Sequence, residues 1–182
     1  WMQGRSVPAA AEKLGRDPVE LAVELILEDD NRTRMVNFVI AEADVDFLLP
    51  KPESIIGSDG RSYTPGGPTG EGQPHPRSYG CFARVLSRYV REKRVLSLEE
   101  GVHKMTAKPA RKLRLDRRGE LREGYFADIT VFDPAAIRDR ATFEAPHQYA
   151  EGVHQVIVDG HLTVDRGTLS DRLVGQLLTR SA

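Results

Sequence analysis

The sequence contains a single cysteine and no long apolar run, and both absences narrow the kind of protein it can be. Cys81 is the one cysteine among 182 residues, so no disulfide can form within the chain. We therefore expect a reducing compartment, the cytoplasm. No apolar run approaches the roughly 20 residues that cross a bilayer, and residues 1–5 hold no apolar stretch typical of a secretory signal. The sequence predicts no membrane contact.

An excess of charge of either sign is also missing. The chain has 26 basic and 27 acidic residues, for a formal net charge of -1. Binding to nucleic acid generally needs a basic face that neutralises phosphates, so we expect no nucleic-acid partner. The remaining composition, 40% hydrophobic and 29% charged, is typical of a globular protein with a sizeable core.

Up to about residue 115 the pattern predicts α/β structure, and after it mostly strands. Helical spacing or capping residues predict helices over 6–15, 17–29, 42–49, 82–90 and 97–109. Apolar runs predict buried strands over 35–40 and 54–59, and strands over 119–121 and 127–132. Residues 156–158 and 162–164 flank Asp159-Gly160 and predict a hairpin. The early helix–strand alternation favours a parallel sheet with crossovers.

Regular structure is not expected between residues 60 and 80. This stretch contains ten glycines and prolines: Gly60, Pro65, Gly66, Gly67, Pro68, Gly70, Gly72, Pro74, Pro76 and Gly80. A loop of this length inside a compact domain usually has a function. Within it, Arg77 could clamp a substrate carboxylate, and His75 could orient a substrate or carry a proton. An exposed loop with incidental charge explains the same residues equally well.

Asp59 is the most informative candidate for catalysis. It ends a predicted buried strand, and catalytic groups collect at the carboxyl ends of strands in parallel α/β folds. A carboxylate there can take a proton from water and return it to a leaving amine. Asp-Gly is also an ordinary turn dipeptide, and the local sequence by itself favours this simpler interpretation.

The histidines do not predict a metal site by themselves. No two of them have the short spacing that places two ligands together; they are His75, His103, His147, His154 and His161. Cys81 precedes an apolar helix face and is more typical of a core residue than of a nucleophile. A phosphate-binding glycine motif is also missing.

Several segments together resemble the N-acyl-D-amino-acid deacylases, the D-aminoacylase family of the amidohydrolase superfamily. The first two segments are Ile-Gly-Ser-Asp-Gly at 56–60 and His-Pro-Arg at 75–77, the latter followed by Tyr79-Gly80 and Phe82. The likeness continues in three further segments, residues 96–100, 104–106 and 109–110. Residues 119–128, 131–134 and 158–160 are similar to a closing block that many amidohydrolases share. Gly101 and Arg114 depart from the residues usual in the family, alanine and glycine.

This resemblance implies a fold and an incomplete enzyme. The expected fold is α/β: residues 1–115 would be the last strands and helices of a metal-dependent hydrolase (β/α)₈ barrel, and residues 116–182 strands of a small β-sandwich. A full barrel takes about 250 residues, so an upstream polypeptide would supply the remainder. Most of the Zn²⁺ ligands expected in such enzymes would lie in that upstream polypeptide.

The resemblance also implies an activity and a set of site residues. The substrate would be a small N-acyl-D-amino acid, hydrolysed to a carboxylate and a free D-amino acid. Asp59 would be general base and then general acid, and could also serve as a metal ligand. His75 and Arg77 match the family's loop near the active-site mouth, and together with Ser58 they are our candidates for substrate binding. Two alternatives stay open: a dihydroorotase- or hydantoinase-like cyclic amidase, and a structural fragment without catalysis.

Overall fold

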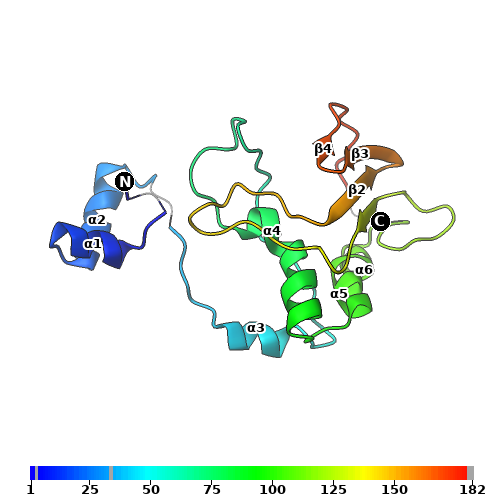
Figure 1. Cartoon of the computed structure of the whole chain (residues 1–182), viewed down its shortest axis with the longest axis horizontal. Helices are drawn as coiled ribbons and strands as arrows, with labels where there is room; N and C mark the ends of the chain where they lie inside the picture. Colours follow the sequence, from blue (N-terminus) through cyan, green and yellow to red (C-terminus); the bar gives the residue numbers. More distant parts are fainter. Residues whose placement is uncertain (3, 33–34, 180–182) are drawn as a thin grey trace.

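The computed structural model describes residues 1–2, 4–32 and 35–179, and Figure 1 gives the arrangement of its elements. The α-helices are α1 (Val7–Leu14), α2 (Pro18–Glu28), α3 (Glu42–Leu48), α4 (Arg77–Arg84), α5 (Leu98–Met105) and α6 (Ala107–Leu113). A π-helix, η1 (Val85–Glu92), continues α4. The strands are β1 (Ile129–Phe132), β2 (Val153–Val158), β3 (His161–Asp165) and β4 (Thr168–Leu169). The α/β content expected from the sequence is confirmed. Among the described residues, no helix is long and apolar enough to cross a membrane.

Helices α1 and α2 form a hairpin with a small core of its own. Ser6 and Asp17 cap the two helices, each accepting a backbone N–H with its side chain. Ala10, Ala11 and Leu21 are buried between the helices. In Figure 1 this hairpin stands apart from the other elements, and residues 35–40 run toward α3 without regular structure.

The larger core contains side chains from both parts of the chain, the predicted α/β part before about residue 115 and the mostly β part after it. Ala83 of α4 and Leu86 of η1 are buried against Ile137, and half-buried side chains of α5, β1 and β2 surround them. On another face of η1, Tyr89 packs with Leu96 and with side chains that include Val45 and Ile56. The helices around residues 77–113 therefore connect the Asp59 region with the later strands.

The strands form one antiparallel sheet in the order β1-β2-β3-β4. The predicted hairpin is confirmed, since β2 pairs with β3 and Asp159 and Gly160 lie between them. Both turn residues have positive φ, 50° and 77°. This conformation suits a two-residue turn that follows the twist of the strands.

The predicted strands at 35–40 and 54–59 are not formed, and the expected parallel sheet is therefore wrong for the described residues. A strand exists through hydrogen bonds to neighbouring strands, and the described residues place no strand beside either segment. The apolar side chains of the first run are consequently exposed, with Phe38 at 76% and Val39 at 81%.

The strand predicted at 119–121 is also wrong, for a local reason. Gly119 has a φ of +82°, and a Cβ on it would lie 2.9 Å from the Thr106 carbonyl oxygen. The backbone bends there and passes close to the start of α6, so the segment cannot continue as a strand. Leu121 is 82% exposed.

Candidate functional site

Asp59 lies on a sharp bend that meets the start of α4. Its φ of 46° is in the left-handed region, which aspartate tolerates better than most residues. The next residue must be small, because a Cβ on Gly60 would lie 2.9 Å from the Ser78 Cα. This close approach brings the Asp59 carboxylate to 2.5 Å from the Arg77 guanidinium. Two candidate residues at the two ends of residues 60–76 are thus in direct contact. The loop ends at residue 76, earlier than the sequence predicted, because α4 begins at Arg77.

His75 is held beside the same ion pair. Its Nδ1 accepts a hydrogen bond from the Arg77 backbone N–H at 3.1 Å, and its ring packs edge-on against Phe143 at 5.1 Å. Burial, and then the positive charge of Arg77, lower the pKa of His75, while Asp59 opposes this shift. The ring is therefore neutral near pH 7, and its accepting nitrogen organises the first turn of α4.

Ser58 and Cys81 lie on the flanks of this group. The Ser58 hydroxyl accepts from the Gly60 N–H at 3.2 Å, which stabilises the bend and leaves the hydroxyl proton free to be donated. The Cys81 Sγ lies 3.9 Å from the Gly57 carbonyl oxygen. Burial raises the pKa of the Cys81 thiol, so Cys81 is not an activated nucleophile.

The described residues bring together Asp59, His75 and Arg77, but they form no metal centre. No group of three or more His, Cys, Asp or Glu side chains in this part of the chain could hold a metal ion. The Asp59 side chain is 85% exposed, so one carboxylate is available and no further ligands converge on it. These residues do not fit a complete Zn²⁺ site.

Lys104, which the sequence patterns do not single out as functional, fixes the segment that leads to Asp59. It is 4% exposed. Its Nζ donates to the Lys51 carbonyl at 2.5 Å and to the Ser54 hydroxyl at 2.8 Å. Its carbonyl oxygen accepts from the Ile56 N–H at 3.2 Å. Burial lowers the pKa of Lys104. No local pattern predicts such a lysine, because its acceptors lie about 50 residues earlier.

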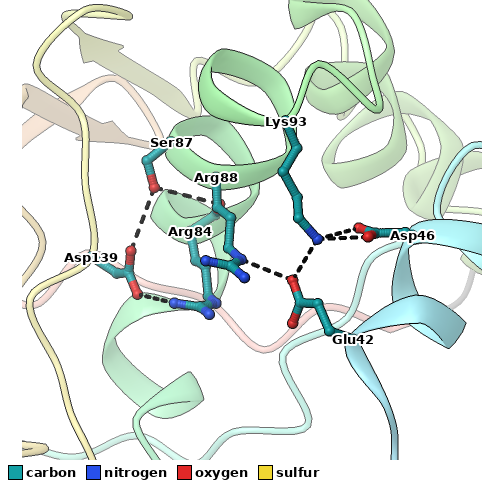
Figure 2. Close-up of polar contacts among 7 residues, drawn as sticks. All are labelled: Glu42, Asp46, Arg84, Ser87, Arg88, Lys93 and Asp139. Carbon is teal, nitrogen blue, oxygen red and sulfur yellow. Dashed lines mark hydrogen bonds and ion pairs between the residues drawn. The ribbon is translucent and has the colours of Figure 1, made fainter.

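A second polar cluster, shown in Figure 2, ties α3 and the residue 139 segment to α4 and η1. The Glu42 carboxylate accepts from Arg88 at 2.8 Å and from Lys93 at 3.0 Å. On the other side, the Asp139 carboxylate accepts from Arg84 at 3.2 Å and from the Ser87 hydroxyl at 3.4 Å. This cluster orients the helix whose first residue is Arg77, without contacting Asp59 itself.

Comparison with known proteins identifies the class that these segments define. A model described as amidohydrolase family matches residues 1–164, and the chain belongs to this family. The chain is 40% identical over 173 residues to the N-acyl-D-aspartate deacylase of Alcaligenes xylosoxydans xylosoxydans, covering 92% of this chain and 33% of the relative. The chain thus spans about a third of the length of the relatives it matches.

Solved structures give the same relationship. One is a crystal structure of a D-aminoacylase, described as defining a novel subset of amidohydrolases. The match covers 97% of this chain and 35% of the D-aminoacylase chain, with a TM-score of 0.81 and 34% identity. The N-acyl-D-glutamate deacylase of Bordetella bronchiseptica, complexed with zinc and a phosphonate mimic of the tetrahedral intermediate, matches 87% of this chain and 31% of its own. Its TM-score is 0.73, at 34% identity. The resemblance seen in the sequence is confirmed.

Proposed function

We propose that this chain is part of a hydrolase that cleaves the amide bond of N-acyl-D-amino acids. The observation that carries the proposal is the contact between Asp59 and Arg77, which joins the two segments that most resemble the D-aminoacylases. Membership of the amidohydrolase family supports the reaction class, and the deacylase names of the relatives support the substrate class.

In the proposed reaction, Asp59 moves one proton. As a water oxygen attacks the acyl carbon, the Asp59 carboxylate accepts the water proton. It then gives that proton to the amide nitrogen as the carbon–nitrogen bond breaks. The direct products are a carboxylic acid and the amine of a D-amino acid. In water the acid then loses its remaining proton and the amine gains one, which gives a carboxylate and a free D-amino acid. Proton transfer by a positioned carboxylate typically contributes about 10²- to 10⁴-fold to the rate.

The neighbouring residues would bind the substrate. Arg77 can offer a fork of N–H donors to the substrate carboxylate, in competition with Asp59. His75, whose Nδ1 is held by the Arg77 backbone N–H, would orient the substrate, and the Ser58 hydroxyl would donate to a substrate oxygen. The Asp59 carboxylate is 85% exposed, so a substrate could approach it from the solvent side.

The proposed architecture places residues 1–115 in the last part of a (β/α)₈ barrel and residues 116–182 in a β-sandwich. An upstream polypeptide would supply the other barrel strands and the ligands of the proposed Zn²⁺, to which Asp59 could add one oxygen. The exposed apolar side chains of residues 35–40 support this arrangement, because the barrel interior and the surrounding helices would cover the two faces of a strand there.

A non-catalytic role is the second candidate for the chain by itself, and one observation favours it. The described residues contain no cluster of metal ligands, whereas a zinc complex is known for a relative. Separated from other polypeptide, the chain would then serve only as scaffold.

The substrate class is tested by a hydrolysis screen of a complete enzyme containing this chain. N-acetylated D-amino acids, their L-enantiomers and cyclic imides would be compared at equal concentration, with release of free amine or ring opening as readout. We expect turnover of the D-series alone. Preferential opening of the cyclic imides would instead favour the cyclic amidase alternative.

A further inference from the structure

His147 links the glycine- and proline-rich loop to α4. Its Nδ1 lies 2.9 Å from the Tyr79 hydroxyl, and its Nε2 lies 3.0 Å from the Gly72 carbonyl oxygen. One imidazole therefore bridges the middle of the loop and the first turns of α4, although it lies 68 residues beyond Tyr79 and 75 beyond Gly72.

The two contacts define how the ring is protonated. A carbonyl oxygen only accepts, so Nε2 must carry the proton and donate to Gly72. In the neutral ring Nδ1 then accepts from the Tyr79 hydroxyl. Burial raises the pKa of Tyr79, with smaller contributions from Tyr149 and Tyr63, so this hydroxyl keeps its proton. Both hydrogen bonds are satisfied at once.

Aromatic packing supports the same link. The Tyr63 ring stacks on Tyr79 with centroids 6.4 Å apart and meets the His147 ring edge-on at 6.4 Å. Tyr79 also packs edge-on against His147 at 5.6 Å and against Tyr149 at 5.6 Å. The first half of the loop is thus held by Tyr63, and the second half by the hydrogen bond to Gly72.

Other hydrogen bonds of residues 61–74 stay inside the loop, within the part of the chain that the structure describes. Gly67 donates to Thr64, Gly70 donates to Gly67, and the Thr64 N–H donates to the Thr69 hydroxyl. These bonds shape the loop but do not fix where it lies. The hydrogen bonds of His147, together with the stacking of Tyr63 on Tyr79, tie the loop to α4. The tie at Gly72 lies a few residues before His75 and Arg77.

We propose that His147 is a positioning residue, which holds the loop of residues 60–76 against α4 so that His75 and Arg77 are ordered for the substrate. This inference rests on the proposed function, because it assigns His147 to the same site. His147 does not touch the reacting atoms, so its loss should weaken substrate binding far more than the proton transfer by Asp59.

His147→Phe tests the proposal, because it keeps a ring for packing and removes both hydrogen bonds. In the complete enzyme, we expect KM to rise about 5- to 50-fold with kcat changed less than about threefold, as two net hydrogen bonds are lost. Amide hydrogen exchange of residues 61–74 should become faster in the same variant. His154→Phe is the matched control, since His154 is exposed on β2, and both readouts should stay at wild-type values.

Two more variants separate positioning from general damage. Tyr79→Phe removes one of the two hydrogen bonds and should give a smaller rise in KM. His147→Gln keeps a donor near the Nε2 position, so it should restore part of the loop protection and part of the KM. An equal loss of kcat and loop protection in His147→Phe and His147→Gln would mean that the residue only supports folding.

The proposal is overturned if exchange of residues 61–74 is unchanged in His147→Phe, or if exchange rises while KM does not. Failure of the proposed function looks different. If the wild-type enzyme hydrolyses no N-acyl-D-amino acid, the proposed deacylase activity is wrong, and so is the role of His147 in substrate binding. The exchange data from the same samples would then still report separately whether His147 holds the loop.

Discussion

The Arg77 guanidinium has two candidate partners, and their competition can be measured. In the chain it contacts the Asp59 carboxylate; in the proposed enzyme it binds the substrate carboxylate. Arg77→Ala should raise KM about 10- to 100-fold, since hydrogen bonds to charged groups contribute about 1.5–3 kcal/mol, and should affect kcat less. Steady-state kinetics on an N-acyl-D-amino acid would check this. Arg172→Ala, at an exposed position, is the control, and an unchanged KM in Arg77→Ala would refute the clamp.

Glu42 should give the stability of the chain a distinctive acid dependence. Hydrogen bonds from Arg88 and then Lys93 lower the pKa of Glu42 from 4.5 to about 2. Because the folded pKa is the lower one, the stabilisation is present above about pH 4.5 and is lost as pH falls toward 2. The carboxylate is partly exposed, so we expect about 1 kcal/mol or less.

The measurement is the urea midpoint at several pH values for wild type, Glu42→Gln and Glu144→Gln. Glu144 is exposed and serves as the control. Glu42→Gln should lower the midpoint at pH 7 and converge with wild type near pH 2. A constant difference across the whole pH range would show that Glu42 acts through packing and not through its charge.

The turns and helix junctions depend on close backbone approaches. Gly152, just before β2, has a φ of +82°, and a Cβ on it would lie 2.4 Å from the Ile137 backbone nitrogen. Gly152→Ala therefore combines left-handed strain with overpacking of the main core, and should lower the free energy of unfolding by about 2 kcal/mol or more.

Gly167→Ala provides the comparison, since Gly167 has a φ of +84° with nothing within 4 Å of the added Cβ. Gly167→Ala therefore has the left-handed backbone strain but no steric clash of the added Cβ. Urea unfolding of the two variants should place Gly152→Ala clearly below Gly167→Ala. Equal losses would contradict the close packing of the residue 152 turn against Ile137.

Local signals in the sequence predicted the elements that form without distant partners. The helix starts predicted at residues 17 and 97 and the Asp159-Gly160 hairpin all formed where the sequence indicated. Asp17 caps the first of these helices, and Ser97 with Glu100 forms a capping box on the second. The runs at 35–40 and 54–59 did not become strands, because a strand also needs neighbours that no local pattern supplies.

In the candidate site, too, the sequence predicted local features but not contacts between distant residues. The sequence placed Asp59 and Arg77 as separate candidates, but not the bend that brings them into contact. It assigned no role to His147 or Lys104, because their partners lie about 50 to 75 residues away. Such contacts depend on tertiary structure, and spacing rules reach only a few residues along the chain.

The molecule as a whole should not behave as a zinc enzyme when it is isolated as these 182 residues. Its described residues contain no cluster of metal ligands, and it spans about a third of the length of its relatives. After equilibration with Zn²⁺ and dialysis, we expect far less than one bound ion per chain by elemental analysis, and no deacylase activity. Stoichiometric zinc with turnover would contradict the proposed upstream source of the ligands.

The proposed proton transfer by Asp59 is tested by the kcat of Asp59→Asn in the complete enzyme. Asparagine keeps the size of the side chain but cannot accept a proton, so kcat should fall about 10²- to 10⁴-fold with unfolding midpoints unchanged. Asp171→Asn, at an exposed position, should retain wild-type kcat. An Asp59→Asn enzyme that turns over at a near-normal rate would show that Asp59 is not the proton carrier.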